Sequence, residues 1–282
     1  MRHLANLRPQ RYGFFRSYQI FPRFFKKKSS RRLKNHYICS RMLYKTRGIV
    51  LHSLPYNDNY VIITIYTEEF GRMAYMVASA RSRKTSVARA LLQPFSVLDL
   101  EVEHQNNRDI HRIKEAKSNF IISQIRHQPV KNAIALFLSE VLYRTIQEKE
   151  ANRALFDFLY RSINWLEIAD DGIANFHLTF LLQLASFIGI RPGKKVYREN
   201  TYFDLLNGIF SETIPSHPHY LNQSDSIVFA RLLRMNYENM ALYTFTGRER
   251  SVIVRHIIDY FRLHLSDFPE IKSLAVMSSL FE

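Results

Sequence analysis

The sequence has a single cysteine, few glycines and no long apolar run. Cys39 lies within the first 41 residues, so the rest of the chain can form neither a disulfide nor a thiolate zinc site. No apolar stretch approaches the roughly 18 residues that a membrane-spanning helix needs. The eight glycines form neither a Walker loop nor a Gly-x-Gly-x-x-Gly turn, and no serine stands in a nucleophile elbow. These absences argue against nucleotide-dependent and covalent catalysis, and they favour an intracellular, cytoplasmic protein without a membrane partner.

The positive charge is unevenly distributed. The chain has a formal net charge of +15 from 40 basic and 25 acidic side chains, and 12 of the basic ones stand in residues 1–41, which contain no acidic residue. The remaining residues therefore carry 28 basic and 25 acidic side chains, a net charge of only +3. Any affinity of the body of the protein for nucleic acid must come from local clusters of charge.

Residues 1–41 are expected to be a disordered basic extension. Basic residues interrupt every candidate for a secretory apolar segment, and Pro9, Gly13 and Pro22 oppose the amphipathic helix of a transit peptide. A nucleic-acid-binding arm through residues 26–32 (KKKSSRR) stays open as an alternative. We expect Met42 to be the biological start of the protein, so that residues 1–41 are translated upstream sequence.

Residues 42–117 show the pattern of a small β-barrel. Stretches rich in β-branched and aromatic residues are separated by turn residues, and Gly71 supplies a positive φ in a hairpin. Residues 98–103 alternate between apolar and acidic side chains. We expect a five-stranded barrel of the OB type, with strands at residues 46–53, 60–67, 72–78, 95–104 and 108–116.

Residues 118–282 change to a helical period, so the predicted fold class is α+β. Apolar stripes predict helices at 130–147, 152–168 and 173–188, the last buried on nearly all sides and closed by Gly189. An insert at about 194–221 holds a predicted β-hairpin at 201–210. Helices resume near Asn222, and Thr246 with Glu249 forms a capping box before another helix.

A basic cluster after the third predicted strand is the main candidate site. Charges on a loop at the rim of a barrel can follow a phosphate backbone, although an ordinary solvated loop would look the same in sequence. Two further cations on the first strand would extend the cluster. The candidate nucleic-acid-binding residues are Lys45, Arg47, Arg81, Arg83, Lys84 and Arg89.

Other polar groups give weaker signals. Tyr56, Tyr60 and Tyr75 could stack on bases or could pack within the fold. The carboxylates at 99, 101 and 103 share a strand face and could bind a cation for nuclease chemistry, although a solvated face explains them equally. His217 and His219 lack further ligands, so we interpret them as part of a turn and expect no metal site.

The last predicted helix carries a second basic group. Its arginines could bind an acidic segment of a partner, or they could form a solvated helix face. The candidate partner-binding residues are Arg248, Arg250, Arg255 and Arg262.

An ordered series of short motifs runs through the chain. In the barrel region the motifs stand at 48–51, 64–67, 71, 78–81, 86 and 92–95; in the helical region they stand at 187–192, 202–204, 208, 210 and 271–274. This series resembles the RecO family of bacterial DNA repair and recombination mediators. The resemblance starts at Met42 and covers essentially residues 42–282.

The resemblance implies a non-enzymatic recombination mediator without a cofactor. Such proteins bind single- and double-stranded DNA, anneal complementary strands coated by single-strand-binding protein, and work with RecR to load the RecA recombinase; whether RecF takes part stays open. The barrel would hold the DNA backbone, and the helical region would take the acidic C-terminal tail of single-strand-binding protein. Many family members carry four zinc-binding cysteines in the insert, whereas residues 194–221 have none. We therefore expect no zinc here.

Two alternatives remain beside the mediator. One is a scaffold whose barrel binds RecR while its contact with DNA is incidental. The other is a metal-dependent nuclease.

Overall fold

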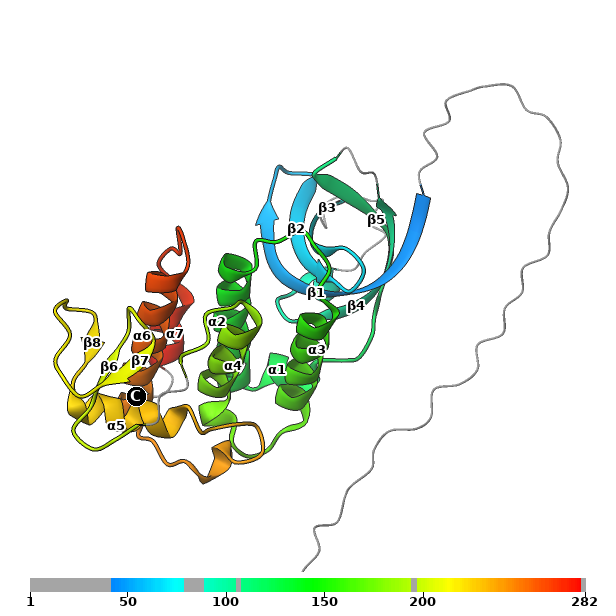
Figure 1. Ribbon diagram of the computed structural model, residues 1–282. Coiled ribbons are helices and arrows are strands. Elements are labelled where there is room, and N and C mark those ends of the chain that lie inside the picture. Colours follow the sequence, from blue (N-terminus) through cyan, green and yellow to red (C-terminus); the bar gives the residue numbers. More distant parts are fainter. Residues whose placement is uncertain (1–41, 79–88, 105–107, 194–196, 280–282) are drawn as a thin grey trace, which may run out of the picture. The chain divides into compact units, whose positions relative to one another are not determined.

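The computed structural model describes residues 42–78, 89–104, 108–193 and 197–279 (Figure 1). Its first part is a closed five-stranded barrel with the strand order β1-β2-β3-β5-β4. All neighbouring pairs are antiparallel except β3 and β5, which are parallel. The predicted OB-type barrel is thereby confirmed. The strands are β1 (Met42–Pro55), β2 (Tyr60–Thr67), β3 (Gly71–Ala78), β4 (Val97–His104) and β5 (Ile110–Ser118).

The first strand closes the barrel because it has two neighbours. Its first half pairs with β4 and its second half with β2, and the register shifts between Val50 and His52. The pairing with β4 explains why β1 begins at Met42, four residues before the predicted start. A Cβ on Gly48 would lie 2.6 Å from a methyl group of Ile65 and 2.7 Å from one of Leu100, so only glycine fits where β1 passes between its neighbours.

The fourth strand begins two residues later than predicted because of Phe95. This residue has φ +64°, in the left-handed region, and its side chain is completely buried. Such a backbone conformation is unusual for a non-glycine residue and interrupts an extended strand. The strand therefore starts at Val97.

The helical region contains the predicted long helices and several short elements that the sequence did not predict. The long helices keep their expected positions, with Asn152, Asn222 and Thr246 as side-chain N-caps and with the Thr246–Glu249 capping box present. They are α2 (Pro129–Thr145), α3 (Arg153–Ile168), α4 (Ile173–Phe187), α5 (Gln223–Leu232) and α6 (Gly247–His264). The short elements are α1 (Ser123–His127), α7 (Ser273–Ser279) and the 3-10 turn η2 (Met240–Leu242). A further 3-10 turn, η1 (Arg89–Leu92), lies between β3 and β4 in the barrel region.

The insert forms a three-stranded sheet instead of a simple hairpin. The predicted hairpin is present as β6 (Tyr202–Asp204) and β7 (Ile209–Ser211), and β8 (Tyr220–Leu221) pairs with the other edge of β6. Phe203 and Phe210 bring their ring centroids within 4.9 Å, and Phe229 of α5 lies 4.4 Å from the ring of Phe203. The insert is therefore attached to the helices by aromatic packing.

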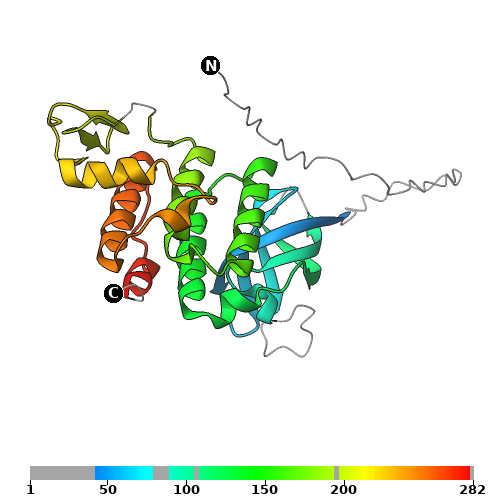
Figure 2. The same cartoon turned by 90° about the horizontal axis from the view of Figure 1, so that it is seen from below.

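Two hydrophobic cores stabilise these parts. One fills the barrel interior, with Ile63, Tyr75 and Leu100 among its fully buried side chains. The other runs through the helices and includes Tyr66 and Phe95 on the outer side of the barrel. The green helices α2, α3 and α4 run side by side in both views (Figures 1 and 2). Among the described residues, no helix combines the length and apolar character needed to cross a bilayer.

Candidate nucleic-acid interface

The predicted basic loop lies largely outside the described residues. Arg81, Arg83 and Lys84 belong to the segment 79–88, and Arg89 opens η1 with its side chain not described. The two ends of this segment are firmly held. Ala78, the last residue of β3, pairs with Tyr60 of β2. After η1 begins, Arg126 of α1 donates hydrogen bonds to the Ala90 carbonyl (2.7 Å) and the Ser96 hydroxyl (3.2 Å).

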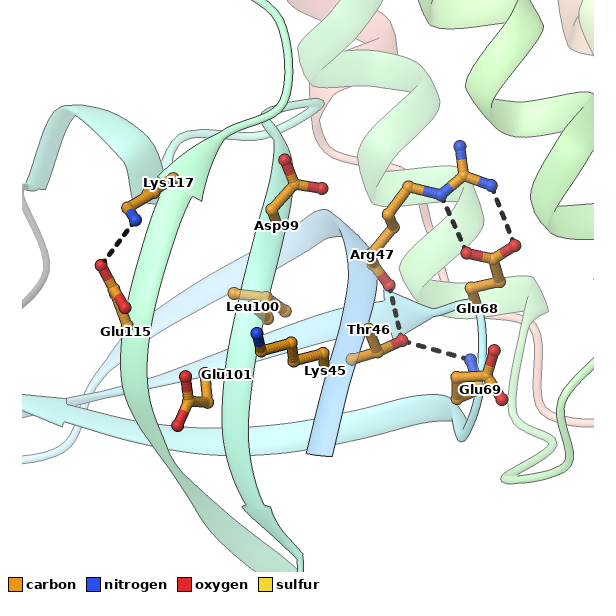
Figure 3. Close-up of a pocket in the computed structure, with 10 residues that line it drawn as sticks. All are labelled: Lys45, Thr46, Arg47, Glu68, Glu69, Asp99, Leu100, Glu101, Glu115 and Lys117. Atoms are coloured by element: carbon orange, nitrogen blue, oxygen red, sulfur yellow. Dashed lines mark hydrogen bonds and ion pairs between the residues drawn. The ribbon is translucent and has the colours of Figure 1, made fainter. Parts of the chain in front are cut away.

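Arg47 has an intramolecular partner. Its guanidinium makes two hydrogen bonds to the carboxylate of Glu68, at 2.8 and 2.9 Å (Figure 3). The same group lies over the rings of Phe156 and Tyr160 on α3. The hydrogen bonds with Glu68 raise the pKa of Arg47 and lower the pKa of Glu68. The geometry thus gives Arg47 a structural role between the barrel and the helices, and its predicted contact with DNA competes with that role.

Lys45 lies on a face where negative charge prevails. A hollow of about 410 Å³ on β1, β4 and β5 is lined by Lys45, Arg47 and Lys117 and by five carboxylates (Figure 3). Lys45 pairs in register with Glu101, and Lys117 forms an ion pair of 2.9 Å with Glu115. A phosphate backbone approaching this face would meet carboxylates beside each cation. These surroundings are unfavourable for a contact between Lys45 and DNA.

The barrel also presents cations that the sequence analysis missed. Arg108 and Arg112 are exposed, and within the described part of the chain no hydrogen bond or ion pair holds either side chain. Arg112 of β5 pairs in register with Met76, two residues before the end of β3. It therefore lies beside the strand that leads into the basic loop. The alternation of buried His111 and Ile113 with exposed Arg112 and Lys114 was the signal that could have identified this stripe.

The tyrosines named as stacking candidates fall into two groups. Tyr75 is completely buried in the barrel core, so base stacking by its ring is excluded. Tyr56 and Tyr60 are 60% and 43% exposed, in the turn between β1 and β2 and at the start of β2. Tyr60 is the register partner of Ala78, so an exposed ring lies beside the entrance to the basic loop.

The carboxylates suggested for metal binding do not form such a site. Asp99 is exposed, whereas Glu103 is 9% exposed and has the ammonium of Lys114 at 3.5 Å. Within the described ranges, no cluster of three or more His, Cys, Asp or Glu side chains could hold a metal ion. His217 lies in the turn before β8, with its Nε2 atom 3.3 Å from Asp204.

The four arginines of the last long helix do not converge. Arg248 lines a groove of about 360 Å³ between α5 and α6, and Arg255 and Arg262 line another of about 480 Å³ between α6 and α7. Arg262 forms an ion pair of 3.0 Å with Asp259. Arg250 donates a hydrogen bond to the Phe245 carbonyl, and burial lowers its pKa. Arg248 and Arg255 are thus the members of this group most accessible to a partner.

Comparisons with known proteins agree with this architecture. The family model "Recombination protein O N terminal" matches residues 42–120, and "Recombination protein O C terminal" matches residues 126–274. The chain is similar to the DNA repair protein RecO of Azobacteroides pseudotrichonymphae, with 42% identity over 241 residues, covering 86% of this chain and 100% of the relative. It is 43% identical to the RecO protein of Phocaeicola vulgatus over 240 residues, 85% of this chain and 100% of the relative. The RecO protein of Bacteroides fragilis is 44% identical over 242 residues, 86% of this chain and 100% of that protein. The chain therefore belongs to the Recombination protein O (RecO) family of DNA repair proteins, which are non-enzymatic mediators.

Proposed function

We propose that this protein is a DNA-binding recombination mediator of the bacterial cytoplasm and nucleoid. In this proposal it binds single- and double-stranded DNA, anneals complementary strands and helps to load RecA on DNA coated by single-strand-binding protein. Residues 42–117 would act as the DNA-binding domain and residues 118–282 as the domain for protein partners, with no cofactor and no zinc. The observation that supports it most is the closed barrel in OB order, which has the basic segment 79–88 leaving its third strand.

The proposed DNA surface combines that basic segment with the neighbouring stripe on β5. Arg81, Arg83, Lys84 and Arg89 would contact the phosphates first, and Arg112 would continue the positive charge onto the sheet. Tyr60 and Tyr56 would offer ring faces to unpaired bases at the same end of β2. Lys45 and Arg47 would contribute least, because carboxylates surround both side chains.

A strand-annealing assay tests the proposed function. Two complementary oligonucleotides, one with a donor fluorophore and one with an acceptor, are mixed with the full chain, with and without single-strand-binding protein. The proposal predicts that annealing accelerates in both conditions. Annealing at the uncatalysed rate in both would contradict a mediator role.

The helical region is the proposed site for the acidic C-terminal tail of single-strand-binding protein. Arg248 and Arg255 are exposed on α6, and apolar side chains line the groove beside each of them. A charge reversal at Arg248 should weaken binding of the tail peptide if the first groove is used. A reversal at Arg255 should do so if the second is used, and unchanged binding in both variants would rule out α6.

A RecR-binding scaffold is the second candidate, and one observation favours it. The face formed by β1, β4 and β5 mixes cations with a larger number of carboxylates, which suits a protein surface better than a phosphate backbone. Reversal of Arg81, Arg83 and Lys84 separates the two candidates. A mediator would lose DNA binding and annealing while RecR still binds; a scaffold would lose RecR binding.

A further inference from the structure

A groove on the helical region lies apart from the candidate sites described above. It has a volume of about 600 Å³ and is bounded by the end of α4, the segment after it, β7 and the end of α5. Leu182 of α4 and Leu233 after α5 are among its apolar side chains. Among the described residues that line it there is no Asp or Glu.

Two arginines make this groove electropositive. Arg191 follows α4, Arg234 follows α5, and both are exposed. Across the described ranges, neither side chain has a hydrogen-bond or ion-pair partner. This differs from the barrel hollow around Lys45, where carboxylates outnumber cations. The guanidinium groups are therefore available to an anionic ligand.

Aromatic rings lie in the same groove. Phe187 has one neighbour stacked on it, Phe158, with ring centroids 4.7 Å apart and planes at 22°. It nevertheless remains 37% exposed. Tyr197 meets Phe210 edge to face, with centroids 5.5 Å apart. Flat rings beside guanidinium groups are the combination that single-stranded nucleic acids recognise, because bases stack and phosphates pair.

We propose that this groove binds a second strand of single-stranded DNA. In this arrangement, Arg191 and Arg234 hold phosphates while Phe187 and Tyr197 stack on bases. Annealing needs two strands held by protein at once, so the inference rests on the proposed function and supplies the place for the second strand. The barrel keeps the first strand.

The composition of the groove favours DNA over an acidic peptide. Two exposed guanidinium groups and two partly exposed aromatic rings match the phosphates and bases of a single strand. An acidic peptide would use the rings only where it carries an apolar side chain. Peptide binding is therefore kept as one outcome of the test.

The test separates binding of one strand from annealing of two. The double variant Arg191→Glu/Arg234→Glu is compared with the parent and with Arg161→Glu. Arg161 is exposed on α3, and the described part of the chain offers its side chain no hydrogen bond or ion pair. Fluorescence anisotropy of a labelled 30-residue oligonucleotide reports single-strand affinity, and energy transfer between complementary oligonucleotides reports annealing. We expect the double variant to lose annealing rate by about tenfold with an affinity within about threefold of the parent, since the barrel still binds one strand. Arg161→Glu should match the parent in both measurements.

Several results would overturn the inference. A double variant that anneals at the parental rate excludes a second-strand role for the groove, while the proposed mediator function stands. Loss of binding to a labelled Glu-rich peptide containing one Phe, with parental annealing, makes the groove a peptide site instead. A parent chain that does not anneal DNA overturns the mediator function and this inference together.

A measurement on the parent protein is independent of how the variant folds. Oligonucleotides containing 5-iodouracil are irradiated in complex with the full chain, and the cross-linked residues are identified by mass spectrometry. The inference expects cross-links at Phe187 or Tyr197 in addition to the barrel. Cross-links confined to the barrel would contradict it.

Discussion

Arg72 of β3 donates a hydrogen bond of 2.6 Å to the carbonyl of Tyr143 at the end of α2, and its guanidinium carbon lies 4.6 Å from the centre of the Tyr143 ring. The same guanidinium also binds the carbonyl of Ile146. A barrel side chain therefore satisfies carbonyl groups that the end of a helix leaves without partners. Together with the packing of Arg47 over the rings of Phe156 and Tyr160 on α3, this contact attaches the barrel to the helices.

Replacement of Arg72 tests that attachment. We expect Arg72→Met to lower the free energy of unfolding by about 1.5–3 kcal/mol, because it leaves partly buried carbonyl groups without a charged donor. Urea denaturation followed by tyrosine and tryptophan fluorescence measures the change. Arg161→Met, at an exposed position on α3, should stay within about 0.5 kcal/mol of the parent. Equal midpoints for Arg72→Met and the parent would show that the contact contributes nothing to stability.

Glu140 of α2 predicts a dependence of stability on pH. Its carboxylate accepts hydrogen bonds from the backbone N–H groups of Lys272 (3.2 Å) and Ser273 (2.9 Å), where α7 begins. Partial burial opposes ionisation, but the hydrogen bonds with Ser273 and Lys272 prevail and lower the pKa of Glu140 from 4.5. A carboxyl group whose pKa is lower in the folded state than in the unfolded state stabilises the fold at pH values above its unfolded-state pKa. This contribution to stability is lost as the pH falls through the folded-state pKa.

The parent should therefore lose more thermal stability than Glu140→Gln between about pH 5 and pH 3. Circular dichroism melting curves at several pH values measure the difference. Glu115→Gln is a suitable control, since Glu115 lies on the barrel surface in an exposed ion pair with Lys117. Parallel declines for the parent and Glu140→Gln would contradict the assignment.

Aromatic packing, and not metal, is expected to hold the insert. Phe203 is completely buried between Phe210 and Phe229. Truncation to Ala should cost about 3–5 kcal/mol, as for other buried aromatic side chains. The chelator EDTA should leave the melting temperature of the parent unchanged. A drop in melting temperature with EDTA, restored by zinc, would contradict this account of the insert.

The two faces of the barrel should differ in their contribution to DNA binding. Arg112 lies beside the strand that leads into the basic loop. We therefore expect Arg112→Glu to weaken the binding of single-stranded DNA severalfold. Lys45 lies among carboxylates, which keep phosphate groups away from this face. Lys45→Glu should therefore change the affinity for single-stranded DNA less than about twofold. Anisotropy titrations at one salt concentration compare the two. A larger loss from Lys45→Glu would place the DNA on the β1, β4 and β5 face.

The sequence predicted those parts of the fold that depend on local pattern. The β-branched stretch at 60–67 is β2, and the Thr246–Glu249 capping box starts α6, because both signals lie within a few neighbouring residues. β8 has only two residues, too few to show the hydrophobic alternation of a strand, and its partner β6 lies in another part of the insert. α7 could not be predicted either, because the carboxylate that accepts a hydrogen bond from the backbone at its start belongs to Glu140 of α2, 133 residues earlier in the sequence.

The candidate site was predicted less completely, for a related reason. A cluster of Arg and Lys can be recognised in the sequence. The carboxylates that lie beside such cations in the fold cannot, because strand pairing brings them together. Lys45 faces Glu101 and Arg47 faces Asp99 only through the pairing of β1 with β4. The exposure of Arg112 likewise depends on which face of β5 turns outward.

The salt dependence of DNA affinity for the parent and for Arg81→Glu/Arg83→Glu/Lys84→Glu tests the central claim most directly. Each phosphate neutralised on a single strand contributes a slope of about 0.7 in log affinity against log salt concentration. If the basic loop holds the backbone, the triple variant should bind weakly and its slope should be smaller by about 2. A triple variant with the affinity and slope of the parent would show that DNA binding, if present, uses another surface.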